Sequence, residues 1–282
     1  MITTGQAIRL GAEQLREVPD PQVDAIALLE KVTGKTPLEL RLHPQDTLTA
    51  EQEERFRSLL LLRSRREPLQ YLLGTQCFYG LEFAVDQRVL IPGPETETLC
   101  ELALRELGHI PRPRVLDLCT GSGAIAVTLK KHCPQAEVTA CDISEEALAV
   151  AKQNAILNDV DVRFLQGDLL APVAGEQYDL LACNPPYIKS AECETLQPEV
   201  TREPRLALDG GVDGLAFYRR LATDAPTYLA DSGWMIAEVG DRQAEQVAAL
   251  LSDIKQFCTV NIHLDLFGIK RFVSARRTPS PT

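Results

Sequence analysis

Beginning at Arg114, short apolar runs with strand-like composition alternate along the chain with segments of helical spacing. These runs are rich in β-branched residues and leucine, and they are Val115–Cys119, Val138–Cys141, Val162–Gln166, Leu180–Cys183 and Trp234–Val239. Helical patterns such as Glu145–Leu157 and Ala216–Leu229 lie between them. Strands that alternate with helices favour a mostly parallel, doubly wound sheet. We therefore predict an α/β fold that ends in an antiparallel hairpin formed by Cys258–Leu264 and Lys270–Ser274.

Residues 1–75 have a different pattern, which predicts a small helical bundle. Thr49-Ala50-Glu51-Gln52 resembles a capping box at the head of a helix that continues through Leu62. Arginines 63, 65 and 66 follow, and we interpret them as cations that offset the negative end of that helix dipole rather than as a nucleic-acid site. The pattern of residues 76–92 predicts a β-hairpin linker, and residues 93–282 form the predicted α/β domain.

A turn of small residues lies between the first predicted strand and a helical segment, and it contains Cys119, Thr120, Gly121, Ser122 and Gly123. Glycines let a ligand approach the backbone closely, and the following helix N-terminus supplies free N–H groups. Asp142 comes about 20 residues later, where a carboxylate can hold ribose hydroxyls; a helix cap is its alternative role. The turn departs from the pattern G-x-G-x-x-G, which argues against NAD.

The apolar run Tyr178–Cys183 ends in Asn184-Pro185-Pro186-Tyr187. Proline has no N–H and cannot continue a strand ladder, so the sequence indicates a stiff loop whose acceptor groups face outward. The Asn184 side-chain oxygen and the Pro185 carbonyl oxygen can each accept one N–H from a planar NH2 group, with the Tyr187 ring packed over it. The alternative is a simple strand-terminating turn with Tyr187 in the core.

The glycine turn, Asp142, Asp168 and Asn184 all come at or just after the ends of predicted strands. Ligands of doubly wound sheets bind at the carboxyl ends of the strands, where the strand order reverses. We therefore expect these residues to share one edge of the sheet. Asp168 could instead cap a turn. Asp117 is expected to lie behind the glycine turn.

Together, these motifs resemble the class I S-adenosylmethionine-dependent methyltransferases that act on amino or amide nitrogens. Further segments make the chain similar to the release-factor glutamine methyltransferases of the HemK/PrmC type. These segments are Arg66-Glu67-Pro68-Leu69-Gln70-Tyr71-Leu72-Leu73-Gly74, Phe78-Tyr79-Gly80, Val89-Leu90-Ile91-Pro92, Pro94-Glu95-Thr96-Glu97 and Glu203–Leu215. The resemblance covers nearly the whole chain. The chain departs from the family at Cys119, where glycine is usual, and at Gly93, where arginine is usual.

The resemblance implies a Rossmann-like methyltransferase sheet and S-adenosyl-L-methionine as the cofactor. It implies that the cofactor-binding residues are Cys119, Thr120, Gly121, Ser122, Gly123, Asp142, Asp168, Leu169 and Asn184, with Glu95 and Glu97 beside the pocket. Asn184, Pro185, Pro186 and Tyr187 would bind the substrate, and Asn184, Pro185 and Tyr187 would be catalytic. The implied substrate is the side-chain amide nitrogen (N5) of the glutamine in the Gly-Gly-Gln motif of class 1 peptide chain release factors. Residues 1–75 would then bind the release factor.

Charge argues against a nucleic-acid substrate. The formal net charge is −11, and residues 76–282 carry 19 basic and 29 acidic side chains. Proteins that bind duplex DNA or RNA generally need a cationic surface, so an acidic domain fits a protein substrate better. A DNA or RNA adenine-N6 methyltransferase would share the Asn-Pro-Pro-Tyr motif, and it remains the rival enzyme. A non-enzymatic scaffold is disfavoured because the acceptor loop is intact.

Cysteine and histidine usage predicts neither disulfides nor a metal site. Eight cysteines occur without a Cys-x-x-Cys pair, which is typical of buried thiols in a reducing compartment. The four histidines lack ligand spacing, so we expect no metal. The N-terminus lacks a signal-peptide pattern and no apolar run is long enough to span a membrane, which together predict a soluble, cytoplasmic protein without a membrane partner.

Overall fold

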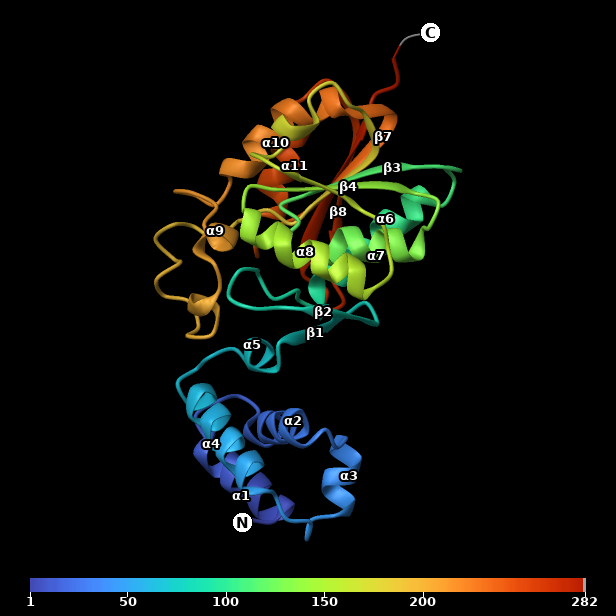
Figure 1. Cartoon of the computed structure of the whole chain (residues 1–282). Coiled ribbons are helices and arrows are strands. Elements are labelled where there is room, and N and C mark those ends of the chain that lie inside the picture. Colours follow the sequence, from blue (N-terminus) through green and yellow to red (C-terminus); the bar gives the residue numbers. More distant parts are fainter. Residues whose placement is uncertain (281–282) are drawn as a thin grey trace. The chain divides into compact units, whose positions relative to one another are not determined.

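The computed structural model describes residues 1–280, so the last two residues of the predicted region 93–282 lie outside the described residues. The chain divides into two compact units (Figure 1). The first contains Met1–Thr75 together with Gln197–Arg202, and the second contains Gln76–Leu196 and Glu203–Thr282. A short segment from late in the sequence therefore belongs with the N-terminal helices.

The first unit is a helical bundle. Its helices are α1 (Thr4–Gln14), α2 (Pro21–Thr33), α3 (Pro37–Leu42), α4 (Ala50–Ser64) and α5 (Leu69–Leu73). Capping boxes begin α1, α3 and α4, at Thr3, Thr36 and Thr49, so the predicted box at Thr49 is confirmed. The apolar faces of these helices meet in a core that includes the fully buried Phe56 and Leu60. The prediction of an N-terminal helical bundle is confirmed.

An ion-pair network inside the first unit joins α2 and α4 to the segment 197–202, which contains the short 3-10 helix η2 (Val200–Arg202). The buried Arg63 donates to Asp24 Oδ2 at 2.7 Å and to Glu199 Oε1 at 2.9 Å. Arg66 donates to both oxygens of Glu199, each at 2.6 Å. Burial raises the pKa of Glu199, but hydrogen bonds from Arg66 and Arg63 outweigh it and lower the pKa to about 2. Arg63 and Arg66 thus have an ion-pair role that the helix-dipole interpretation did not predict.

The second unit is built on a seven-stranded sheet with the strand order β5-β4-β3-β6-β7-β9-β8. The strands are β3 (Arg114–Leu118), β4 (Glu137–Asp142), β5 (Arg163–Gln166), β6 (Tyr178–Cys183), β7 (Leu229–Glu238), β8 (Phe257–Leu264) and β9 (Lys270–Arg277). Strands β3 to β7 pair in parallel, and β9 runs antiparallel to both β7 and β8. The predicted mostly parallel sheet with an antiparallel C-terminal hairpin is confirmed.

Helices cover both faces of this sheet (Figure 1). Helices α6 (Glu95–Leu107), α7 (Ala124–His132) and α8 (Glu145–Leu157) contribute to one apolar core. Helices α10 (Ala216–Tyr228) and α11 (Ala244–Ser252) contribute to a second core on the other face. This two-layered burial explains why the central strands are apolar at successive positions instead of alternating with polar residues.

Shorter elements complete the unit. Strands β1 (Thr75–Phe78) and β2 (Leu81–Ala84) form a separate two-stranded sheet. Their Phe78 and Phe83 rings pack edge to face at 5.9 Å and join the core under α6 and α7. The 3-10 helix η1 (Ala171–Val173) follows β5, and the short helix α9 (Arg205–Leu208) precedes α10.

The strand order reverses between β3 and β6. After β3 the chain continues to β4 and β5 on one side, and then crosses to β6 on the other side of β3. Leu118 pairs with Cys183 at the last position of both strands. Cys119 and Asn184 therefore leave neighbouring strands at the same edge, which is where doubly wound sheets bind their ligands.

Candidate active site

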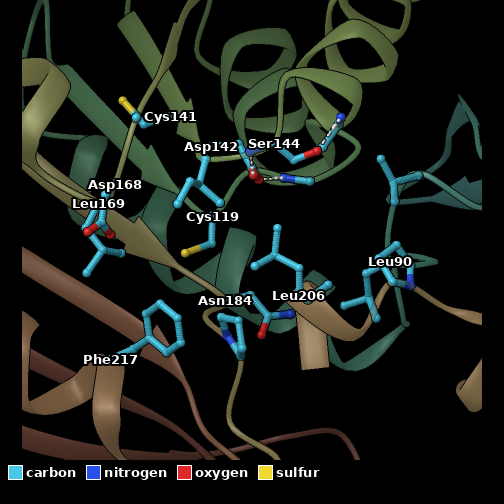
Figure 2. Close-up of a pocket in the computed structure, with 18 of the residues that line it drawn as sticks. Leu90, Cys119, Cys141, Asp142, Ser144, Asp168, Leu169, Asn184, Leu206 and Phe217 are labelled. Atoms are coloured by element: carbon cyan, nitrogen blue, oxygen red, sulfur yellow. Dashed lines mark hydrogen bonds between the residues drawn. The ribbon is translucent and has the colours of Figure 1, made fainter. Parts of the chain in front are cut away.

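A cavity of about 280 Å³ opens at the carboxyl ends of the parallel strands (Figure 2). Seven of the residues predicted from the sequence line it: Cys119, Gly121, Asp142, Asp168, Leu169, Asn184 and Pro186. The other predicted residues do not line it. Of these, Thr120, Ser122, Gly123 and Pro185 are buried and Tyr187 is half-buried. The structure thus brings residues from the carboxyl ends of four strands around one space, as the edge argument predicts.

The glycine turn is supported by Asp117, which is fully buried at the end of β3. Its Oδ2 accepts a hydrogen bond from the Thr120 hydroxyl at 2.6 Å and another from the Ala126 N–H at 3.2 Å. Burial raises the pKa of Asp117 to about 7, although both hydrogen bonds favour the charged form. Asp117 therefore joins the turn to the first turn of α7, behind the cavity.

The backbone of the turn explains its small residues. Cys119 has a φ of 57°, in the left-handed region that glycine enters at less cost than other residues. A Cβ on Gly123 would lie 3.0 Å from the Ala151 Cβ, so the close approach of α7 to α8 requires glycine there. A Cβ on Gly121 would meet no atom within 4 Å, which leaves the turn open towards the cavity. Cysteine at position 119 keeps the glycine-like conformation despite its side chain.

Asp142 connects the glycine turn to the start of α8. Its Oδ2 accepts from the Gly121 N–H and its Oδ1 accepts from the Ser144 N–H, both at 2.9 Å. Ser144 is the N-cap residue of α8, and its hydroxyl oxygen accepts from the Ala147 N–H at 3.1 Å. Asp142 is therefore not the helix cap. Burial raises the pKa of Asp142, and the backbone hydrogen bonds oppose that rise.

The loop after β5 brings Asp168 and Leu169 to the cavity. Asp168 Oδ2 accepts from Arg220 Nη2 of α10 at 2.8 Å, and both side chains are about half exposed. Leu169 is buried and has a φ of 48°. In Figure 2 it lies near Phe217, and the cavity has an apolar wall here. Ile143, which follows the last residue of β4, also lines the cavity.

The loop after β6 is held by three residues from other parts of the second unit, Thr96, Glu238 and Gln243. Asn184 Nδ2 donates to Thr96 Oγ1 of α6 at 3.2 Å. The Thr96 hydroxyl donates to Glu238 Oε2, at the end of β7, at 2.6 Å. The Tyr187 hydroxyl reaches the other oxygen of Glu238 at 3.5 Å, and the Tyr187 ring packs against the core under α10 and α11. Gln243 Nε2 donates to the Tyr187 carbonyl oxygen at 2.9 Å, which fixes the end of the loop.

Glu238 is a second buried acid of this region, with 4% of its surface exposed. Burial raises its pKa to about 7, whereas the hydrogen bond from Thr96 and the charge of Arg271 lower it. Burial also raises the pKa of Tyr187. A carboxyl group with a pKa near neutrality therefore lies behind the acceptor loop.

Several lining residues were missed by the sequence reasoning. Leu206, Phe217 and Arg220 line the cavity, although only Leu206 lies in a segment that carried the family resemblance. Glu95 and Glu97, expected beside the pocket, are not among its lining residues. Glu97 instead accepts from the Tyr79 N–H at 2.7 Å. An isolated aromatic or arginine on an amphipathic helix carries no signal for a ligand, which explains these omissions.

Within residues 1–280, no group of three or more His, Cys, Asp or Glu side chains is arranged to hold a metal ion. All eight cysteines are free thiols, and Cys119 and Cys141 line the cavity. In the same part of the chain, no helix is both long and apolar enough to cross a membrane.

Comparison with known proteins assigns a class to this architecture. Residues 97–211 match the family described as Methyltransferase small domain, and residues 6–74 match the PrmC N-terminal domain. The hMettl16 catalytic domain, solved in complex with a 3'UTR hairpin, matches the fold with a TM-score of 0.56 and 18% identity, over 82% of each chain. A methyltransferase from Pyrococcus furiosus matches with a TM-score of 0.51 and 16% identity, over 71% of this chain and 90% of its own. The second unit is a Rossmann-like methyltransferase domain.

Full-length relatives narrow the class. The release factor glutamine methyltransferase of Deinococcus radiodurans is 42% identical over 260 residues, which cover 92% of each chain. That of Geobacter sulfurreducens is 42% identical over 275 residues, which cover 97% of this chain and 94% of its own. The chain belongs to the release factor glutamine methyltransferase family.

Proposed function

We propose that this protein transfers a methyl group from S-adenosyl-L-methionine to the side-chain amide nitrogen (N5) of the glutamine in the Gly-Gly-Gln motif of class 1 peptide chain release factors. The observation that carries the proposal is the setting of Asn184. This side chain lines the cavity, and its NH2 group is bound to Thr96. Its amide oxygen is therefore free to accept an N–H from a substrate amide.

The cavity fits the proposed cofactor by the chemistry of its walls. The Asp142 carboxylate lies where ribose hydroxyls can donate to it, and Ile143, Leu169 and Phe217 supply an apolar slot for an adenine ring. The open face of Gly121 leaves room for the amino-acid end of the cofactor. When bound, S-adenosyl-L-methionine supplies an electrophilic methyl group on a sulfonium. The residues Cys119, Thr120, Ser122, Gly123, Asp168 and Asn184 complete the proposed cofactor site.

The acceptor loop accounts for the reactivity of a weak nucleophile. An amide nitrogen attacks poorly because its lone pair is delocalised into the carbonyl group. Asn184 Oδ1 and the Pro185 carbonyl oxygen each accept one hydrogen of the substrate NH2 group. These hydrogen bonds orient the nitrogen for in-line attack and stabilise the positive charge that develops on it. Pro186 and Tyr187 limit the space around the flat amide.

The release factor is the proposed partner, and residues 1–75 are the proposed substrate-binding domain. Free glutamine offers the same amide but little remote binding energy, so orientation must come largely from surfaces outside the pocket. The first unit has its own apolar core and a network that fixes segment 197–202, which is a rigid basis for such a surface. The acidic second unit argues against a direct nucleic-acid substrate.

The proposal is tested by mass spectrometry of a purified class 1 release factor after incubation with the protein and S-adenosyl-L-methionine. The expected result is a mass gain of one methylene on the peptide that contains Gly-Gly-Gln, located on the glutamine side chain. A factor in which this glutamine is replaced by asparagine, and a single-stranded adenine-containing oligonucleotide, are the controls. Methylation of the oligonucleotide instead of the factor would contradict the proposal.

A further inference from the structure

Asn184 is held by a chain of two hydrogen bonds that ends on a buried acid. Its Nδ2 donates to Thr96 Oγ1 at 3.2 Å, and the Thr96 hydroxyl donates to Glu238 Oε2 at 2.6 Å. Thr96 is 6% exposed and Glu238 is 4% exposed. The three residues come from the loop after β6, the first turn of α6 and the end of β7. This chain lies behind the cavity, because neither Thr96 nor Glu238 lines it.

The direction of these hydrogen bonds is set by the number of hydrogens available. A hydroxyl group has one hydrogen, and an ionised carboxylate can only accept. While Glu238 is ionised, Thr96 therefore uses its hydrogen on Glu238 and can only accept from Asn184. The two ends of an asparagine side chain are otherwise similar in shape and can exchange places. Because Thr96 accepts, the NH2 group of Asn184 must face it and the oxygen must face away. The buried acid therefore decides which end of the Asn184 amide is presented.

Glu238 is itself held firmly. The Tyr218 hydroxyl donates to the Glu238 backbone carbonyl at 2.7 Å, and Tyr218 is fully buried. The other carboxylate oxygen of Glu238 faces the Tyr187 hydroxyl at 3.5 Å. One acid therefore contacts Tyr187 directly and Asn184 through Thr96. Fixed donors and acceptors of this kind keep a reactive group within the narrow range of orientations that catalysis needs.

We propose that Thr96 and Glu238 are positioning residues for methyl transfer, which hold the Asn184 amide with its oxygen directed at the substrate NH2 group. This proposal rests on the function proposed above, because it assumes that Asn184 accepts from the substrate. Without the Thr96 hydroxyl, the Asn184 side-chain amide can rotate so that its oxygen and its NH2 group exchange places. Its NH2 group would then face the NH2 group of the substrate, and two donors cannot bind each other.

Thr96→Val tests the proposal because valine has nearly the same shape and lacks the hydroxyl. We expect kcat to fall by about 10-fold to 100-fold. This is less than the roughly 100-fold to 1,000-fold cost of losing a direct hydrogen bond in the transition state, because Thr96 acts through Asn184. The Kd for S-adenosyl-L-methionine and the KM for the release factor should change by no more than about twofold, since uniform binding is not affected. Thr96→Ser should restore most of kcat because it returns the hydroxyl.

Thr98→Val is the matched control. Thr98 lies on the same helix and is buried to a similar extent, at 9% exposure, but its hydroxyl has no hydrogen-bond partner within the described residues. The variant should therefore keep kcat at the wild-type value. Comparable thermal unfolding midpoints for the two valine variants would show that a loss of activity in Thr96→Val is not caused by unfolding. Equal loss of kcat in both would overturn the proposal.

A double-mutant cycle then shows whether Thr96 acts through Asn184. In single-turnover assays, Thr96→Val should lower the rate in the wild-type background and produce no further loss in Asn184→Ala. Independent, multiplicative losses would overturn the proposal. If Asn184→Ala alone retains near-normal turnover, the proposed role of the acceptor loop fails, and this inference fails with it. If Asn184→Ala is impaired but Thr96→Val is not, only the positioning role is refuted.

Discussion

Replacing Asp142 separates its two structural contacts from its proposed contact with the cofactor. The carboxylate accepts the Gly121 N–H through one oxygen and the Ser144 N–H through the other, each at 2.9 Å. Asp142→Ala removes both acceptors and the proposed acceptor for the ribose hydroxyls. Asp142→Asn keeps the shape but has a single oxygen, so its NH2 group must face one of two backbone donors. Both variants should therefore loosen the glycine turn.

The magnitude follows from the number and kind of hydrogen bonds. A hydrogen bond to a charged acceptor contributes about 1.5–3 kcal/mol. Burial raises the pKa of Asp142 and so offsets part of this gain. We expect Asp142→Ala to reduce the free energy of unfolding by about 1–3 kcal/mol. The binding free energy of S-adenosyl-L-methionine should weaken by a similar amount, which corresponds to an increase in Kd of roughly 5-fold to 150-fold.

Isothermal titration calorimetry measures the affinity, and chemical unfolding measures the stability. Ser144→Ala is the control, because it removes the cap of α8 without changing the Asp142 carboxylate. It should cost about 1 kcal/mol of stability and leave the Kd within about twofold. An unchanged Kd in folded Asp142→Ala would refute the ribose role and leave Asp142 as a support of the turn.

Three further predictions address the acceptor loop, the half-buried acid Glu203 and the helical unit. Asn184→Ala should lower turnover by at least about 100-fold and change cofactor affinity only a few-fold, as single-turnover mass spectrometry and calorimetry can check; normal turnover would exclude its amide from the reaction. Glu203 accepts from the Ile91 N–H, and burial raises its pKa to about 7 from 4.5, so its contribution to stability is complete below about pH 4.5 and is lost as the pH rises through 7. Glu203→Gln should thus raise the free energy of unfolding near pH 8 by up to about 3 kcal/mol and flatten its pH dependence in urea unfolding, whereas an unaltered slope would contradict the raised pKa. Deleting residues 1–75 should spare cofactor binding but reduce methylation of an intact release factor far more than that of a short Gly-Gly-Gln peptide. The deletion also removes the contacts that Arg63 and Arg66 make to Glu199, so full-length Glu199→Gln is the control for the loss of these contacts. Equal effects of the deletion on both substrates would argue against a substrate-binding role for residues 1–75.

The sheet could be predicted because its signals are local. Each central strand is a short apolar run that ends at a polar or small residue, and the predicted helix Glu145–Leu157 has the observed bounds. Segment 197–202 could not be assigned in the same way. Its Glu199 belongs with the first unit through Arg63 and Arg66, which lie more than a hundred residues earlier in the chain. Nothing in the local pattern around Glu199 indicates these partners.

In the candidate site too, some features could be predicted from local sequence patterns and others could not. Backbone turns that follow strands are visible in the sequence, so the edge that carries Asp142, Asp168 and Asn184 could be located in advance. The identity of a hydrogen-bond partner could not. For Asp142 the sequence allowed a ribose ligand or a helix cap, and only the observed Ser144 cap removes the second alternative. For Tyr187 it allowed a cavity wall or the core, and the side chain both packs on the core and contacts Glu238.

Thr96 and Glu238 show why the support of a site is harder to predict than the site. They are separated by 142 residues, and α6 precedes the first strand of the parallel sheet. Glu238 ends an apolar strand, where a carboxylate would be expected to face a ligand. Instead, it is 4% exposed, and one of its carboxylate oxygens accepts from Thr96 of α6. A buried acid with a pKa of about 7 would be costly as a purely structural element, because an apolar side chain could fill the same space. The presence of this acid beside Asn184 and Tyr187 is accounted for if the orientation of the acceptor loop matters more for function than the stability that an apolar side chain would add.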